Sequence, residues 1–471
     1  MFIRKIDVSN FRLFPIEPYF SIDNLNIPDN TREGSGLTVF VGENGCGKTT
    51  LLDSLALPLL EYKADSFSID DLNDPQQQCL ISVYSESPFK VHGTMPNSSF
   101  QAKGFLFKAK MRDRSSRNYL SSLIVSDQLF IRETDNKPKD GSPDLRVSVN
   151  NPFLGKRFSE NDILFLDRNR YYQIRSGSFN QTRFDRLMED LNYQYVKGKK
   201  GDYDVNSKIS EEILKTNISA DYLTSALEGF KSLTGISIHL DFIENYHPFK
   251  AASFTQRKPN GQQIKIDSMG SGYEMIFSLI YSYQLSLQSG KQLIVLIDEP
   301  ELHMHPSLQQ KLVSFLLEIS KYVQIFITTH SPLLIKQISE NKSAKILILH
   351  NNQTVTEMEG RKLPYFSANE TNYLAFGLAT EEYHNELYEH LKSYFGEKMS
   401  YLEFDTSFFI EKHRELKDCQ WKGHPNEVSR HTFVRNQIHH ITDNGKPSYE
   451  ALKESIERMR TICDEETTVE G

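Results

Sequence analysis

Residues 42–50 read GENGCGKTT and match the pattern G-x-x-x-x-G-K-[ST]. The apolar run 37–41 in front of them predicts a buried strand, and residues 49–61 behind them predict a helix. Glycines at these spacings let successive backbone N–H groups point toward one position, and the first turn of the helix adds its own attraction for an anion. The strand, the loop and the helix together predict a phosphate-binding site.

The side chains of this loop predict a nucleotide with a metal ion. Lys48 is expected to reach the β- and γ-phosphates, and the Thr49 hydroxyl is expected to bind Mg²⁺. We therefore expect ATP and Mg²⁺ as cofactors. The other loop residues expected to contact the nucleotide are Asn44, Gly45, Cys46, Gly47 and Thr50.

A second apolar strand, 293–297, ends in the acid pair Asp298-Glu299. Ligands of α/β sheets bind at the carboxyl ends of buried strands, so Asp298 is predicted to bind the metal and Glu299 to act as general base for the attacking water. An acid pair in this place can also cap a helix, but the phosphate loop favours the metal site. His330, after the strand 323–328, is predicted to act with Glu299 by sensing the γ-phosphate.

The order of elements from residue 263 onward predicts an α/β fold. Strands are expected at 263–266, 293–297 and 323–328, with helices at 272–287 and 306–322 between them. Such alternation is typical of a largely parallel sheet covered by helices. Further strands are expected at 2–8, 79–84 and 163–166, and a hairpin at 346–349 and 355–358.

The predicted phosphate loop and acid pair are far apart in the chain, so the domain that carries them is split. We expect its two parts at 1–60 and 263–365, with a long mixed α/β insertion at 61–262. The insertion lacks the heptads of a coiled-coil arm. Within it, residues 167–200 mix cations with aromatic side chains, which fits either a nucleic-acid surface or a solvated helix and loop.

The last part of the chain, 366–471, differs in charge and pattern. It holds 12 Lys and Arg against 20 Asp and Glu, which accounts for the whole net charge of -8, and it reads as an α-helical module. Within it, Arg435-Asn436 and His440 look like the R-N-x-x-x-H motif of HEPN ribonucleases. Catalysis on RNA and a helix that docks a partner protein both remain open, although the acidic charge repels nucleic acid.

Two further observations concern the cellular setting. No apolar stretch approaches the ~18 residues that cross a membrane, and the first residues lack a signal-peptide core. The four cysteines are far apart and form no CxxC pair, which excludes a disulfide scaffold. We expect a cytoplasmic protein with no membrane partner.

The segments GENGCGKTT, IDSMGSGYE, LIVLIDEPELHMHP and FITTHSP together resemble the ABC-type ATPase head of the RecF, SMC and OLD group. The resemblance covers roughly residues 1–60 and 263–350. It implies an ABC-type P-loop NTPase head in which two copies sandwich two ATP molecules, each phosphate loop facing the signature motif of the other. A homodimer or a higher homo-oligomer is therefore expected.

This resemblance also assigns roles to individual residues. Asp298 and Glu299 match the Walker B pair and His330 matches the switch histidine, while Arg12 matches an Asn-Phe-Arg element near the base. Ser271-Gly272 aligns with the signature motif, although the usual serine falls on Gly270. The remaining matches are Gln76, Gln77 and Gln78 as candidates for the Q-loop glutamine, and His303 and His305 in a structural "EPExHxHP" loop.

The whole arrangement, with FGLATEEYHNELY and HTFVRNQIHH near the end, looks like the PtuA ATPases of Septu and retron-linked anti-phage systems. That resemblance implies an ATPase subunit that regulates a separate HNH nuclease, PtuB, with nucleic acid (DNA, RNA or the msDNA of a retron) as a further partner. An ATP-gated HEPN-type ribonuclease toxin and a DNA-repair or SMC-like ATPase are the alternatives.

Overall fold

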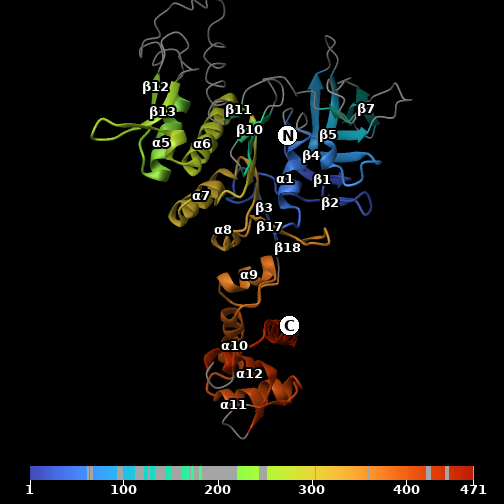
Figure 1. The fold of residues 1–471 in the computed structure, drawn as a ribbon, viewed down its shortest axis with the longest axis vertical. Helices are drawn as coiled ribbons and strands as arrows, with labels where there is room; N and C mark the ends of the chain where they lie inside the picture. The colour runs from blue at the N-terminus through green and yellow to red at the C-terminus, as the bar shows by residue number, and fades with distance from the viewer. Residues whose placement is uncertain are drawn as a thin grey trace, which may run out of the picture. The chain divides into compact units, whose positions relative to one another are not determined.

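The computed structural model divides the chain into two compact units, Met1–Glu357 and Met358–Gly471, which are described separately below (Figure 1). The residues that the structure describes are 1–60, 63, 67–92, 99–111, 121–125, 128–132, 145–150, 161–168, 171–173, 180–182, 220–242, 252–302, 304–358, 360–365, 367–420, 426–440 and 445–469.

The first unit is built on a six-stranded sheet with the strand order β18-β17-β3-β16-β15-β9. All neighbours pair in parallel except β17 and β18, which form an antiparallel hairpin. A parallel sheet has both faces covered, which explains why its strands are continuous apolar runs. The strands are β3 (Leu37–Val41), β9 (Asn161–Leu166), β15 (Gln292–Asp298), β16 (Gln324–Thr328), β17 (Lys345–Leu349) and β18 (Val355–Glu357). The predicted α/β fold with a largely parallel sheet is confirmed.

A second sheet of the same unit is antiparallel, with the order β2-β1-β4-β5-β6-β7 and β8 paired with β5. One hydrophobic cluster joins both sheets through Leu51, Leu52 and Leu55 of α1 (Lys48–Ala56). The helix that follows the phosphate loop is therefore anchored on both sides. The strands are β1 (Ile3–Ser9), β2 (Phe20–Ile22), β4 (Cys79–His92), β5 (Ser99–Met111), β6 (Ser121–Val125), β7 (Gln128–Arg132) and β8 (Leu145–Asn150).

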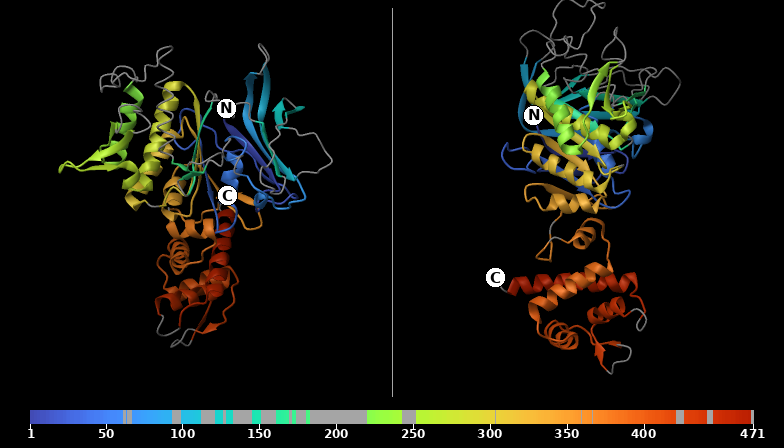
Figure 2. Two further views of the ribbon diagram at one scale, coloured as in Figure 1. Left: turned by 45° about the horizontal axis from the view of Figure 1, so that its top comes forward. Right: turned by 90° about the vertical axis from the view of Figure 1, so that its left-hand side faces the viewer.

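Helices and short strands complete this unit. Helix α5 (Ala220–Thr234) packs against α6 (Ser271–Ser289), as Figure 2 shows. Helix α7 (Pro306–Ile319) begins at a proline and buries Leu312, Val313, Leu316 and Ile319. The remaining elements are η1 (Ile69–Asp71), β10 (Tyr171–Gln173), β11 (Asn180–Thr182), β12 (His239–Phe242), β13 (Ala252–Arg257), β14 (Gln263–Lys265), η2 (Ile266–Met269) and α8 (Pro332–Ser339).

The range predicted as an insertion, 61–262, supplies strands to both sheets. β4 and β5 belong to the antiparallel sheet, and β9 lies beside β15 at one edge of the parallel sheet. Residues 183–219 lie outside the described residues, as do most of the cations of 167–200.

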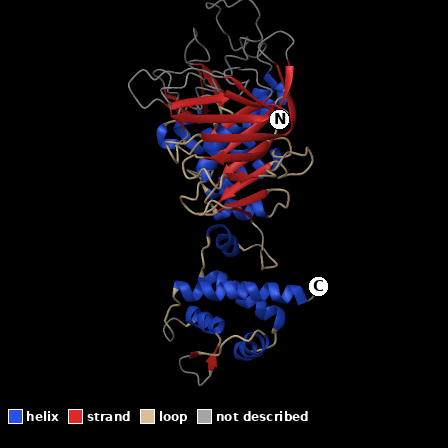
Figure 3. Cartoon of the chain, turned by 90° about the vertical axis from the view of Figure 1, so that its right-hand side faces the viewer, coloured by secondary structure: helices blue, strands red, loops and turns tan. Residues whose placement is uncertain are grey.

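Among its described residues, the second unit is helical apart from one hairpin of two short strands, β19 (Cys419–Gln420) and β20 (Glu427–Val428) (Figure 3). Its core includes Tyr383, Tyr388, Phe404 and Phe409. Its helices are α9 (Ala368–Phe376), α10 (Glu381–Phe395), α11 (Tyr401–Phe404), η3 (Asp405–Lys412, of π type), α12 (Arg430–His439) and α14 (Tyr449–Val469). Within the described part of the chain, none of the helices is both long and apolar enough to span a bilayer.

Candidate nucleotide-binding site

The loop between β3 and α1 has the backbone that a phosphate site requires. Gly42, Gly45 and Gly47 all have positive φ, at 146°, 83° and 105°. A Cβ on Gly42 would lie 2.3 Å from the carbonyl oxygen of Leu349, so only glycine fits there. Asn44, Gly45 and Thr49 are exposed, whereas Cys46, Gly47, Lys48 and Thr50 are buried.

The Lys48 ammonium lies inside this loop. It donates to the carbonyl oxygens of Gly42 at 2.9 Å and Glu43 at 2.8 Å, and its nitrogen is 3.6 Å from the Cys46 sulfur. Burial lowers the pKa of Lys48, because removal from water disfavours the charged ammonium. A phosphate group beside the loop would stabilise that charge, so the loop suits an anion.

The Thr49 hydroxyl and the Asp298 carboxylate meet beside the loop. The hydroxyl oxygen is 3.3 Å from Asp298 Oδ1 and 3.2 Å from Oδ2. The Thr328 hydroxyl also donates to Asp298 Oδ1. Asp298 is buried, and burial raises its pKa. A hydroxyl and a carboxylate are the hard oxygen ligands that Mg²⁺ prefers, so these two residues fit the predicted metal site.

Glu299 follows Asp298 with its backbone in the left-handed region, at φ 48°. Its N–H donates to both the carbonyl and the hydroxyl oxygen of Thr328, each at 3.1 Å, and these bonds hold the strained backbone in place. The Glu299 carboxylate oxygen Oε1 is 4.0 Å from His330 Nε2. The structure thus brings together the two residues that the sequence predicted to be catalytic.

His330 is held by Glu301, a residue whose role is not apparent from the sequence. Glu301 Oε1 accepts hydrogen bonds from the Thr329 hydroxyl at 2.9 Å and from the His330 backbone N–H at 2.8 Å. Burial raises the pKa of Glu301. The pKa of His330 is lowered, first by burial and then by the positive charge of Lys48. Glu301 was visible in the sequence as the third acid of Asp298-Glu-Pro-Glu, but a sequence gives no hydrogen-bond partners.

Arg168 is the other site residue that the sequence analysis did not assign. Its Nη1 lies 3.5 Å from Glu299 Oε1. The register of the parallel strands β9 and β15 pairs Leu166 with Ile297. Arg168 and Glu299 each lie two residues after this pair, so the register brings them side by side. In the sequence it was grouped with the cations of 167–200, and only the neighbouring strand at 163–166 pointed to this place.

Arg12 contacts α1 one turn after Thr49, in a network of carboxylates. Its guanidinium contacts Asp53 Oδ2 at 2.6 Å and Asp71 Oδ1 at 2.8 Å, and Lys63 also pairs with Asp53 at 2.6 Å. The guanidinium therefore ties α1 to the segment before β4. Its expected role near the base stays a prediction.

The signature candidates Ser271 and Gly272 form the first turn of α6. Between described residues, no hydrogen bond or ion pair joins either of them to the phosphate loop. The Q-loop candidates, Gln76 to Gln78, precede β4 in the antiparallel sheet. His305 caps α7 by accepting from the Ser307 N–H at 3.3 Å, whereas His303 lies outside the described residues.

The motif residues of the second unit do not share one surface. Arg435 stacks on the Tyr401 ring at 3.7 Å, and its Nη1 donates to Asn436 Oδ1 at 3.3 Å. The Asn436 side chain is buried, whereas His440, which ends α12, is exposed. The structure thus keeps Arg435 and Asn436 together inside the unit, and the chemical role of the motif stays a prediction.

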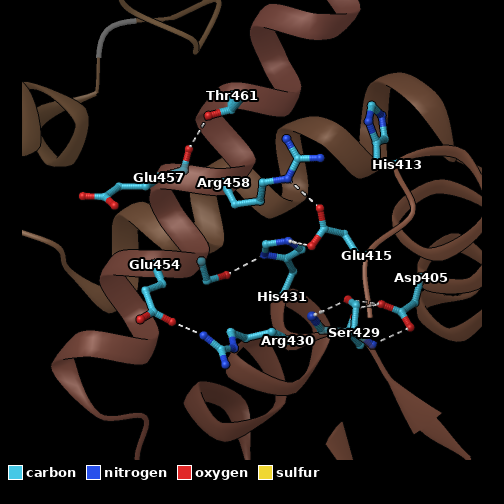
Figure 4. Close-up of polar contacts among 12 residues, drawn as sticks. Asp405, His413, Glu415, Ser429, Arg430, His431, Glu454, Glu457, Arg458 and Thr461 are labelled. Carbon is cyan, nitrogen blue, oxygen red and sulfur yellow. Dashed lines mark hydrogen bonds and ion pairs between the residues drawn. The ribbon is translucent and has the colours of Figure 1, made fainter. Parts of the chain in front are cut away.

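Two buried polar networks hold the same unit together. His431 Nδ1 is 2.8 Å from the Ser455 hydroxyl, which is 2.9 Å from His384 Nε2. Figure 4 shows Glu415 in contact with both His431 and Arg458. In the second network, the Asp405 carboxylate accepts from the Ser429 N–H and hydroxyl and from the Thr432 hydroxyl. These contacts satisfy buried polar groups of α10, α12 and α14.

Comparison with known proteins gives relatives of two kinds. The chain is 24% identical to the Retron Ec83 probable ATPase of Escherichia coli, over 73% of this chain and 72% of that protein. It is 22% identical to the Retron Vc95 probable ATPase of Vibrio cholerae, over 72% of this chain and 73% of that protein. It is 24% identical to the OLD nuclease of Thermus scotoductus over 70% of its length, spanning 59% of that nuclease.

Among solved structures, an SMC head bound to the C-terminal winged-helix domain of ScpA matches with a TM-score of 0.44 and 14% identity, over 76% of this chain and 97% of the other. Residues 37–336, more than half of the chain, match one protein family. That range begins at β3 and includes the phosphate loop, Asp298, Glu299 and His330. The chain is therefore a P-loop ATPase with an α/β fold, and it belongs to the family described as "AAA domain, putative AbiEii toxin, Type IV TA system".

Proposed function

We propose that this chain binds ATP with Mg²⁺ at the phosphate loop and acts in the cytoplasm as the ATPase subunit of an anti-phage defence complex. In that complex it controls a separate HNH nuclease, as PtuA ATPases do. The observation that carries the nucleotide site is the contact of Thr49 with Asp298, 3.2 Å apart beside the buried Lys48 ammonium. The two retron ATPases among its relatives support the defence role.

The residues of the site have distinct tasks in hydrolysis. Lys48 and the N–H groups of the loop bind the β- and γ-phosphates, and Thr49 and Asp298 hold Mg²⁺, which neutralises phosphate charge when bound. The Glu299 carboxylate accepts a proton from the attacking water. His330, 4.0 Å from that carboxylate, is placed to respond to the γ-phosphate, and Glu301 keeps it there.

We further propose that two copies complete each other's sites. Ser271 and Gly272 open α6, whose N-terminal N–H groups attract anions, and they make no hydrogen bond to the phosphate loop of their own copy. A head-to-head homodimer would place this turn against the ATP of the partner copy. Binding of DNA, RNA or a retron msDNA is part of the same proposal, because two of the relatives are named as retron ATPases.

Calorimetry of the full chain with ATP and Mg²⁺ tests the nucleotide site. Lys48→Ala removes the cation that the loop encloses and should abolish measurable ATP binding. Lys345→Ala is the matched control, because that lysine pairs with Glu357 on the edge hairpin, at 3.5 Å. Equal ATP affinity of wild type and Lys48→Ala would contradict the assignment.

Phage plating tests the defence role separately. Cells carrying this gene with a neighbouring gene for a small HNH protein should resist phage, and Lys48→Ala or loss of the HNH gene should remove the resistance. Resistance that persists without the HNH gene would rule out control of that nuclease and leave the nucleotide site intact.

A further inference from the structure

We propose that Arg168 reads the γ-phosphate: it pairs with Glu299 when the site holds no nucleotide, and it transfers its guanidinium to the γ-phosphate when ATP binds. This inference rests on the proposed binding of ATP at the phosphate loop. It adds a residue that distinguishes ATP from ADP and that follows β9, outside the segments in which the sequence showed nucleotide motifs.

The first argument is position. Arg168 follows β9 at the edge of the parallel sheet where β15 delivers Glu299, and its Nη1 is 3.5 Å from Glu299 Oε1. A general base lies within about 3 Å of the water that it activates. That water lies about 3–3.5 Å from the atom it attacks. The γ-phosphate is therefore within reach of an arginine that already touches the base.

The second argument is freedom of movement. The Arg168 side chain is 59% exposed, whereas that of Glu299 is 13% exposed. The Glu299 backbone is fixed by two hydrogen bonds from its N–H to Thr328. When an anion enters, the arginine is the member of this pair that can turn toward it.

The third argument is charge. The Glu299 carboxylate is the one acid to which Arg168 is paired within the described residues, and Lys48 and Thr49 of the phosphate loop supply the other side chains of the proposed phosphate site. A γ-phosphate brings more negative charge than a single carboxylate and offers oxygens for a bidentate guanidinium contact. The exchange of partners would also release Glu299 to accept a proton.

The experiment compares affinities for the imido analogue of ATP and for ADP, measured by calorimetry on the full chain with Mg²⁺. Arg168→Ala should weaken binding of the ATP analogue about ten- to a hundredfold, the range expected for one lost charge-assisted bond, and leave ADP affinity within about twofold. Arg168→Lys should restore part of the preference because it keeps the charge. Arg32→Ala is the matched control, since Arg32 is an exposed arginine paired with Asp29 in the same unit.

The possible results separate this inference from the proposed function. If Arg168→Ala lowers the affinity for the ATP analogue and for ADP equally, Arg168 has a merely structural role and the inference is wrong. If the substitution lowers neither affinity, the inference is also wrong. If the wild type binds no nucleotide, or Lys48→Ala binds as the wild type does, the nucleotide site itself is wrong. Loss of the preference for the ATP analogue in Arg168→Ala alone supports the inference.

Discussion

The Thr49 hydroxyl oxygen lies 3.2 Å from an Asp298 carboxylate oxygen, although 249 residues separate the two positions. Thr49 is in the first turn of α1 and Asp298 is the last residue of β15. Between them the chain builds most of the antiparallel sheet and the edge strand β9. The proposed metal site is therefore assembled only when α1 and β15 come together in the folded chain.

Glu299→Gln should slow ATP hydrolysis about a hundredfold or more and leave ATP affinity nearly unchanged, because the amide keeps the shape of the base but accepts no proton. Phosphate release measures the rate, and calorimetry measures the affinity. Glu33→Gln is the control, since Glu33 is an exposed acid near Lys321 at 3.6 Å. Equal rates for wild type and Glu299→Gln would show that another group is the base.

Glu301→Ala should reduce turnover by releasing His330. The substitution leaves the Thr329 hydroxyl and the His330 N–H without their shared acceptor, which costs about 1–3 kcal/mol of folding free energy. Glu301→Gln keeps an acceptor oxygen and should retain more activity than Glu301→Ala. Urea unfolding and phosphate release on the same samples check this order, and an inverted order would remove the positioning role.

Incubation of the purified chain with total RNA should leave the RNA intact, both with ATP and with EDTA. Arg435 and Asn436 contact each other inside the helical unit, and His440 is exposed at the end of α12. Arg435→Ala should therefore lower the stability of this unit through the lost stacking on Tyr401. Metal-independent cleavage by the wild type that disappears in Arg435→Ala and in His440→Ala would instead favour a HEPN-type ribonuclease.

Acid should destabilise the second unit. Burial, together with the nearby positive charges of His431, His439 and Arg435, lowers the pKa of His384 to about 3. Between about pH 6.5 and 3 the unfolded chain binds a proton at this position that the folded chain does not. As the pH decreases through this window, the free energy of unfolding therefore decreases, by at most about 1.4 kcal/mol per pH unit.

A second group adds to this effect at lower pH. The pKa of Glu415 is lowered to about 2, first by its contact with His431 at 3.6 Å and then by Arg458, so its contribution is lost as the pH falls below about 4.5. Hydrogen exchange of α10 amides at pH 7.5 and pH 5.5 measures the window of His384. His384→Gln should reduce the difference in α10 amide protection between the two pH values, and His440→Gln should leave that difference unchanged. A pH-independent α10 in the wild type would contradict the prediction.

The amino-acid sequence by itself determined the local elements of the site. The glycines at 42, 45 and 47 fix the loop because only they adopt its positive φ values without strain. The apolar runs 37–41, 293–297 and 323–328 predicted strands β3, β15 and β16, since strands buried on both faces contain almost no polar residue. Because parallel strands end at one edge, the sequence also predicted that Asp298, Glu299 and His330 lie near the loop.

Only the tertiary structure decided which side chains face one another. Arg168 and Glu301 acquire their places from the register of β9 with β15 and from hydrogen bonds to the residues after β16, and no spacing along the chain encodes those contacts. In the second unit, the helix pattern was readable, but the burial of Arg435 and Asn436 follows from packing between α12 and its neighbours. Local periodicity selects an element, whereas the burial of its polar groups depends on partners that the chain brings from far away.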